Sequence, residues 1–229
     1  MPERTELFRY ERKFLVPADC GLSSDLDIRH NPALFSGIYH PRTVNNIYLD
    51  CSALGHYFAN LQGAQIRTKV RIRWYDKLHG HVARPVLEFK TKQGLLGQKT
   101  SFPLKPFHLD GAFTGEFLRA ALYGSDLPGE VRHLLSDLEP TLVNSYDRRY
   151  YQSADRRYRV TLDSDLKFFR VRPGHNTWLC QAPRCDFHVL ELKYDQAYAD
   201  AARFIADALP FRMTRMSKYV FGLESLDGY

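Results

Sequence analysis

Basic and apolar residues alternate with a period of two between residues 67 and 74 of this chain. In the run RTKVRIRW, arginine or lysine fills the odd positions, whereas Val70, Ile72 and Trp74 fall on the other set. Because successive side chains of a β-strand point to opposite faces, the pattern predicts a strand with one cationic and one apolar face. Like charges about 6 Å apart repel by about 3 kcal/mol at an effective dielectric near 20, so an anionic counterpart is expected. A solvated charged face on a single strand is the alternative.

Further segments repeat this division into a charged and a largely apolar face. They span residues 9–14, 86–92, 146–150, 157–166 and 189–194. Such strands cannot all bury their charged faces in a dry core, since an unpaired buried charge costs several kcal/mol. We therefore predict an α+β fold in which an antiparallel β-barrel, closed or nearly closed, surrounds a hydrated, charge-lined interior. Arg71 and Arg73 should point inward, while Ile72 and Trp74 should pack under covering helices.

Apolar residues at helical spacing supply candidates for those covering helices. The spacing predicts helices over residues 112–122, 128–138, 196–209 and 216–226. Residues 21–41 are predicted to form a loop with a short helix, and residues 173–183 a connection rich in Pro and Gly. No linker or long repeat divides the chain, so its 229 residues are predicted to form one domain, 1–229.

Composition narrows the class of protein and of partner. The net charge of +6 favours an anionic partner: nucleic acid, acidic lipid or a phosphate compound. No apolar run is long enough to span a membrane and the N-terminus lacks a signal-peptide core, so we expect a cytoplasmic protein. Cys20, Cys51, Cys180 and Cys185 lack zinc-site spacing and are expected to be free thiols. Tyrosines and arginines between residues 146 and 151 could stack on bases, but no nucleic-acid-binding motif accompanies them.

Eight short motifs along the chain together resemble one protein family. They are YERKF (10–14), NIYLD (46–50), KVRIRWY (69–75), LEFKTK (87–92), SYDRRY (145–150), RVTLDSDL (159–166), LELKY (190–194) and SKY (217–219). In this order they resemble the VTC domain, the vacuolar transporter chaperone type of polyphosphate polymerase within the triphosphate tunnel metalloenzyme superfamily. The resemblance implies an antiparallel eight-stranded β-barrel tunnel that binds triphosphate and polyphosphate, with helices over its outer faces and a divalent metal, Mn²⁺ or Mg²⁺.

The resemblance also implies roles for individual residues. The family's basic phosphate ligands match Lys13, Arg71, Arg73, Lys90, Arg148, Arg159 and Lys218. Further substrate-binding candidates are Lys69, Lys92, Lys99, Lys193 and Tyr48. Glu191 matches the metal-binding glutamate, and Glu11 and Glu88 are additional metal candidates. Lys218 is expected to reach the tunnel mouth, with a solvated helix face as the alternative.

The N-terminal motif departs from the wider superfamily in one position. Where that signature alternates Glu-x-Glu-x-Lys, this chain has Arg9, Glu11 and Lys13, which argues against a two-metal hydrolase. The leading hypothesis is metal-dependent phosphoryl transfer that makes polyphosphate from ATP. Hydrolysis of tripolyphosphate or a related phosphoanhydride, and polyphosphate binding without turnover, are the alternatives. We expect ATP or another triphosphate and polyphosphate as partners, and no nucleic acid. A membrane-protein partner and the oligomeric state are left open.

Overall fold

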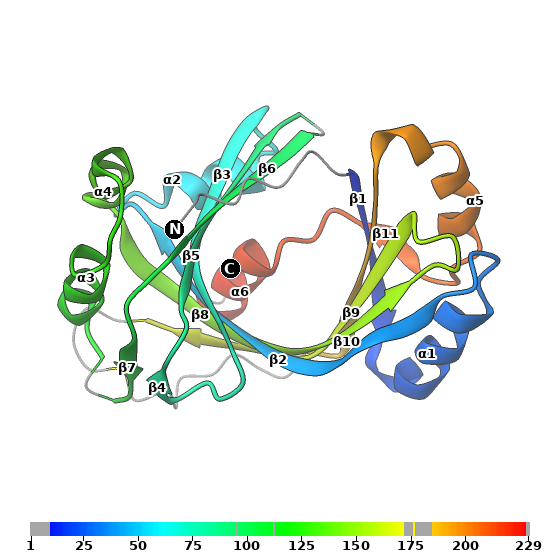
Figure 1. Cartoon of the computed structure of the whole chain (residues 1–229), viewed down its shortest axis with the longest axis horizontal. Coiled ribbons are helices and arrows are strands. Elements are labelled where there is room, and N and C mark those ends of the chain that lie inside the picture. Colours follow the sequence, from blue (N-terminus) through cyan, green and yellow to red (C-terminus); the bar gives the residue numbers. More distant parts are fainter. Residues whose placement is uncertain (1–9, 95, 112, 172–175, 177–184, 228–229) are drawn as a thin grey trace.

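One large antiparallel sheet forms the centre of the computed structural model, which describes residues 10–94, 96–111, 113–171, 176 and 185–227. In the described part of the chain, its nine strands run in the order β11-β1-β10-β9-β8-β2-β3-β5-β6 (Figure 1). They are β1 (Tyr10–Pro17), β2 (Ser36–Asp50), β3 (Ile66–Tyr75), β5 (Val86–Gln93), β6 (Leu96–Pro103), β8 (Glu139–Gln152), β9 (Tyr158–Arg170), β10 (Phe187–Tyr194) and β11 (Arg212–Thr214). A second sheet pairs β4 (Gly80–Val82) with β7 (Phe107–Leu109).

The sheet curves into a trough and does not close, so the prediction of an eight-stranded closed barrel is wrong in strand number and in closure. Its edges are β6 and the short β11, which form no pair with each other. Two arms, β3-β5-β6 and β10-β1-β11, rise on either side of the long β2, β8 and β9 (Figure 1). Side chains rather than backbone join the arms, since Lys90 of β5 donates to Glu11 of β1 at 2.9 Å. Both arms carry cations on their inner faces.

Helices cover the outer face of each arm. On one side are α3 (Gly115–Tyr123) and α4 (Gly129–Leu135), and on the other are α1 (Gly21–His30) and α5 (Ala201–Asp207) (Figure 1). Ile72 and Trp74 are buried in the core cluster that α3 and α4 complete, and the Trp74 ring packs against Phe107. The predicted register of this strand is therefore confirmed.

The last helix, α6 (Lys218–Asp227), packs on the concave face of the sheet instead of the outside (Figure 1). Tyr219 stacks on Tyr48 with ring centres 4.9 Å apart, and its hydroxyl donates to the buried Asp50 at 2.6 Å. A side chain at Gly222 would overlap Phe168 and lie 2.7 Å from Leu142 Cδ2. Glycine therefore lets α6 approach β8 and β9 closely.

The remaining elements agree with the sequence in part. The short helix expected within residues 21–41 is α1, but residues 36–41 begin strand β2, so the loop prediction is wrong there. The helix predicted over residues 196–209 is split into η2 (Gln196–Tyr198) and α5. The other short elements are η1 (Ala18–Cys20) and α2 (Gly55–Leu61). The predicted 173–183 connection falls, apart from residue 176, outside the described residues.

Two further expectations concern cysteines and membrane segments. Cys20, Cys51 and Cys185 are free thiols, as predicted, and Cys180 lies outside the described residues. Across the part of the chain that the structure describes, no helix is both long and apolar enough to cross a membrane.

Candidate functional site

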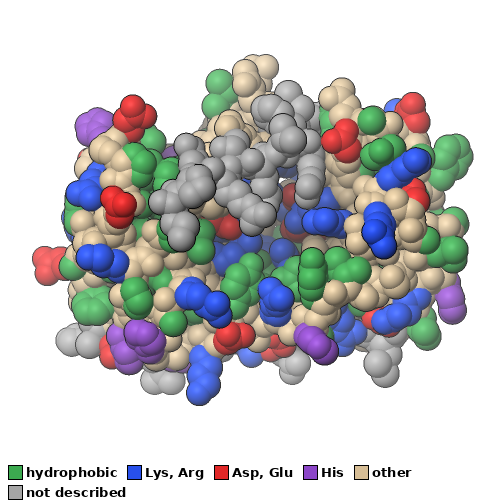
Figure 2. Space-filling model, viewed as in Figure 1, with side chains coloured by type: hydrophobic (Ala, Val, Ile, Leu, Met, Phe, Trp, Pro, Cys, Tyr) green, Lys and Arg blue, Asp and Glu red, His purple; other side chains and the backbone are tan. Residues whose placement is uncertain are grey.

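A cavity of about 180 Å³ opens on the concave face of the sheet. Among the described residues, ten basic side chains and two carboxylates line it. The basic residues are Lys13, Lys69, Arg71, Arg73, Lys90, Lys92, Lys99, Arg148, Lys193 and Lys218, and the carboxylates are Glu11 and Glu191. Tyr48, Tyr146, Ser217, Gly97 and Gln98 complete the lining. Figure 2 shows basic side chains in the hollow at the centre of the molecule.

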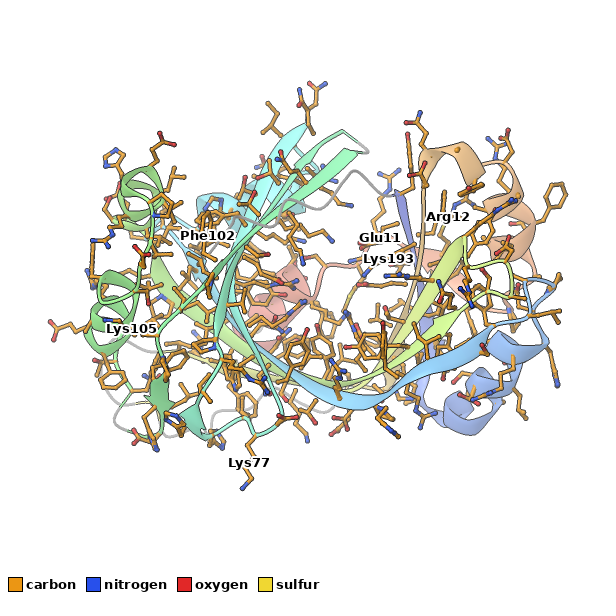
Figure 3. The ribbon with its side chains drawn as sticks, viewed as in Figure 1. Glu11, Arg12, Lys77, Phe102, Lys105 and Lys193 are labelled. Carbon is orange, nitrogen blue, oxygen red and sulfur yellow. The ribbon has the colours of Figure 1, made fainter. Side chains whose placement is uncertain are left out.

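Strand alternation brings these side chains together. Lys69, Arg71 and Arg73 are alternate residues of β3, and Lys90 and Lys92 alternate on the neighbouring β5. On the opposite arm, Glu11 of β1 pairs in register with Lys193 of β10, and Figure 3 shows the two next to each other. Lys218 comes from the first turn of α6 and Arg148 from β8. The predicted charged faces therefore converge on one cavity.

Glu88 anchors the arginines of one arm. Its carboxylate lies 2.8 Å from Arg71 Nη2, 3.6 Å from Arg73 Nη1 and 3.5 Å from Lys99 Nζ. Burial raises the pKa of this carboxyl, but attraction to Arg73, Arg71 and Lys99 outweighs burial and holds the pKa well below its usual range. Glu88 is thus an ionised carboxylate that orients Arg71 and Arg73.

Glu191 lies at the centre of the other cationic group. Its carboxylate is 3.0 Å from Lys193 Nζ and 3.6 Å from the Nζ atoms of both Lys13 and Lys218. Arg148 Nη2 is 3.7 Å away. Although burial opposes ionisation, the four cations hold the pKa of Glu191 well below its usual range. Glu191 is therefore a carboxylate at neutral pH, placed among the side chains expected to bind phosphate.

Asp163 is a charged residue of this region that the sequence analysis did not single out. It is fully buried on β9 and accepts hydrogen bonds from Arg148 Nε and Nη2 at 2.5 and 2.7 Å. Lys218 Nζ lies 2.6 Å from Oδ2, the oxygen that also accepts from Arg148 Nη2. The Tyr146 ring lies beneath the Arg148 and Lys218 cations at 5.3 and 4.9 Å. The alternation of residues 157–166 places Asp163 on a charged face. Its partner Arg148 lies on β8, so the sequence of β9 alone does not show that Asp163 is paired.

Lys218 is buried in this network, so the alternative of a solvated helix face is wrong for it. Its side chain is 7% exposed. Burial lowers the pKa of Lys218, yet attraction to Asp163 and Glu191 outweighs burial and raises the pKa above its usual value. Lys218 is therefore a fixed cation in the lining of the cavity.

In three lysines on β3 and β5 the pKa is lowered, whereas that of Lys218 is raised. Burial, together with repulsion from Lys13 and Lys193, lowers the pKa of Lys90 to about 8. Burial and neighbouring cations also lower the pKa of Lys69 and of Lys92. Lys69 Nζ donates to Ser217 Oγ at 2.8 Å instead of to a carboxylate. The cavity holds more positive charge than its own carboxylates offset, and a polyanion would relieve this excess.

Two sequence candidates differ from the rest in position or chemistry. Arg159 is exposed on β9, where it pairs in register with Lys193, and it does not line the cavity. Tyr48 does line the cavity, and the buried ring is fixed by stacking on Tyr219.

The carboxylates fit a divalent metal only in part. Among the described residues, no group of three or more His, Cys, Asp or Glu side chains is arranged to hold a metal ion. Glu11 and Glu191 do approach each other, because Lys13 Nζ lies 3.4 Å from one and 3.6 Å from the other. Glu11 Oε1 is buried without a hydrogen-bond partner. Since Mg²⁺ and similar ions often bind one or two carboxylates plus substrate phosphates, these two residues fit a metal that arrives with its substrate.

Comparison with known proteins identifies the family. The family model described as VTC domain matches residues 8–227. The chain belongs to the VTC domain family. No curated protein matches it in sequence.

Solved structures share the fold of this VTC domain. The PH1819 protein from Pyrococcus horikoshii OT3 aligns with a TM-score of 0.51 at 10% identity, over 94% of this chain and 98% of that chain. A putative adenylate cyclase from Vibrio parahaemolyticus aligns with a TM-score of 0.51 at 11% identity, over the same shares of the two chains. At these identities the likeness establishes the fold alone.

Proposed function

We propose that this VTC domain transfers the γ-phosphoryl group of ATP to the end of a polyphosphate chain in a metal-dependent reaction. The observation that carries the proposal is the excess of cations in the cavity: among the described residues, ten basic side chains line it, and the carboxylates paired with them are four, Glu11, Glu88, Asp163 and Glu191. An excess of this kind is costly without an anion, and a linear polyphosphate supplies many closely spaced negative charges. Membership of the VTC domain family supports chemistry on triphosphate or polyphosphate.

The proposed reaction needs positioned cations more than a protein nucleophile. The bond from the γ-phosphorus to its bridging oxygen breaks, a terminal oxygen of polyphosphate attacks in line, and ADP leaves. Arg71 and Arg73, held in place by Glu88, would bind phosphate oxygens through their planar guanidinium groups. Lys218, fixed by Asp163, would place a point charge in the wall of the cavity. Charge that develops on the transferred group is thereby stabilised.

A bound divalent metal would neutralise negative charge on the phosphate groups of the substrate. Glu11 and Glu191 are the residues that would hold it, since both are ionised and both lie within 3.6 Å of Lys13 Nζ. Lys13 itself, donating to the backbone oxygen of Met216 at 3.2 Å, keeps the two carboxylates and α6 in one arrangement.

The first prediction concerns the product. The purified chain incubated with ATP and Mn²⁺ should yield ADP and long polyphosphate, separated from orthophosphate on a gel. Orthophosphate without polyphosphate would replace the proposal with hydrolysis, and binding without any product would leave a polyphosphate-binding module. The Arg73→Ala variant should lose the product, whereas Lys77→Ala should keep it, because Lys77 points away from the molecule (Figure 3).

The second prediction follows from the pKa of about 8 at Lys90. Below pH 8 this lysine is a cation ready for phosphate, whereas above pH 8 it must take up a proton on binding. Tripolyphosphate affinity should therefore fall as pH rises from 7 to 9.5, by up to about tenfold per unit for one such group. Isothermal calorimetry at fixed ionic strength measures the decline.

Arginine at this position provides the control for that pH dependence. Lys90→Arg keeps the charge throughout the range and should flatten the decline, whereas the surface variant Lys77→Arg should retain it. Because all proteins see the same tripolyphosphate, titration of the ligand itself cancels in the comparison. Identical pH profiles for Lys90→Arg and wild type would exclude Lys90 as the titrating group.

A further inference from the structure

An aromatic and arginine cluster lies on the concave face of the sheet beyond the cavity. It consists of Tyr39, Arg42, Tyr75 and Tyr150. Arg42 Cζ is 5.6 Å from the centre of the Tyr39 ring and 5.9 Å from that of Tyr75, so the two rings flank the guanidinium. Tyr39 also meets Tyr150 edge to face, with ring centres 5.6 Å apart. Two cation–π contacts and one ring pair thus hold the cluster together.

Backbone register connects this cluster to the phosphate-binding arginines. Arg42 of β2 pairs with Arg148 of β8, and Tyr39 pairs with Tyr150. From one pair to the other, β2 advances by three residues and β8 by two. This β-bulge brings Tyr39 onto the same face as Arg42. Tyr75 lies two positions beyond Arg73 on β3 and therefore also faces inward. The cluster is continuous with the end of the cavity that Arg73 and Arg148 line.

Packing does not account for the exposed aromatic rings. Tyr39 is 58% exposed and Tyr75 is 42% exposed, and neither belongs to a buried hydrophobic cluster of the described residues. By contrast Tyr48 and Tyr146, on the same face, are almost fully buried. Open ring surface next to a site for anions indicates a partner that combines a flat apolar part with a negative charge.

We propose that the Tyr39–Arg42–Tyr75 stack, braced by Tyr150, binds the base of the nucleoside triphosphate whose phosphates occupy the cavity. This inference rests on the proposed function. A nucleobase stacks on tyrosine rings and on guanidinium planes, and every base offers a π face, so the platform should accept purines and pyrimidines alike. Tripolyphosphate has no base and would use the cavity alone. The cluster therefore distinguishes a nucleotide donor from a bare phosphate chain.

The third prediction compares the two ligands in variants of the platform. Tyr39→Ala, Tyr75→Ala and the double variant should weaken ATP binding by about fivefold or more, the lower bound for loss of one base–aromatic stack. Tripolyphosphate affinity should change less than twofold, and this value also reports that the cavity is intact. Calorimetry with each ligand at one ionic strength provides both numbers. Tyr39→Trp should retain or increase ATP affinity.

Tyr123→Ala is the matched control, because Tyr123 is 49% exposed on α3, away from the cavity. It should change neither affinity. ATP binding unaltered in the double variant, with tripolyphosphate still bound, would overturn the base platform alone. Equal weakening of both ligands would also overturn it, since the tyrosines would then support the phosphate site. Failure of the wild-type chain to bind tripolyphosphate would instead refute the proposed function beneath it.

Discussion

Replacement of Arg148 by alanine is expected to lower the free energy of unfolding by about 3 kcal/mol or more. Arg148 makes two hydrogen bonds to the fully buried Asp163, and removal of one partner leaves a buried carboxylate with Lys218 as its remaining cation. Breaking a buried ion pair on one side typically costs about 3 to 5 kcal/mol. Urea denaturation at pH 7, where Asp163 is ionised, measures the loss.

The neighbouring Arg149 provides the control for this variant. Arg149 is exposed and lies 3.8 Å from Asp25, so Arg149→Ala should cost under about 1 kcal/mol. Adding Asp163→Asn to Arg148→Ala should recover part of the stability, because it removes the buried carboxylate that has lost Arg148, while Lys218 keeps Glu191 at 3.6 Å as an opposite charge. A cost below about 1 kcal/mol for Arg148→Ala, or no recovery in the double variant, would show that the pair does not stabilise the fold.

The alternating strands made much of this fold predictable. A period of two determines which residues share a face. That rule alone predicts that Trp74, the residue after Arg73, lies on the opposite, buried face. The helices over residues 112–122, 128–138 and 216–226 were likewise visible as apolar stripes, and α3, α4 and α6 overlap them. Local periodicity carries these features because each depends on residues close together in the chain.

Closure and strand number depend on contacts that periodicity does not contain. Residues 36–41 include Gly37, His40 and Pro41, a composition typical of loops, yet they extend β2 because β8 offers a partner. Similarly, β6 is polar and was missed, although it pairs with β5 along its whole length. Whether the edges then meet depends on contacts between strands far apart in the chain, which no single segment encodes.

The candidate site, too, has residues that alternation predicts and residues that depend on contacts between strands. Most basic candidates line one cavity, since their alternation already placed them on inward faces. The roles of individual residues stay predictions. The sequence did not indicate Asp163, Tyr146 and the platform around Tyr39 as site residues. The position of each depends on a partner in another strand or on a β-bulge. Arg159 shares the inward face but lies at an exposed strand end, beyond the cavity.

The second large effect is expected for Glu191→Gln, which should lower metal-dependent turnover by about a hundredfold. The substitution removes a carboxylate expected to hold the metal while keeping the shape of the side chain. The same change releases Lys13, Lys193, Lys218 and Arg148 from an opposing charge. Tripolyphosphate affinity without metal should therefore equal or exceed that of wild type. Turnover and metal-free affinity moving in opposite directions is the signature of this role.

Glu88→Gln is the informative comparison for that experiment. Glu88 is equally buried among cations, but it contacts Arg71, Arg73 and Lys99 instead of Lys13. Its variant should disturb phosphate binding by releasing the arginines from their fixed orientation, and the concentration of Mn²⁺ that half-saturates turnover should stay unchanged. In Glu191→Gln that concentration should rise. Thermal unfolding with and without tripolyphosphate shows whether each variant is folded. A folded Glu191→Gln protein with wild-type turnover and wild-type Mn²⁺ dependence would remove Glu191 from the metal site.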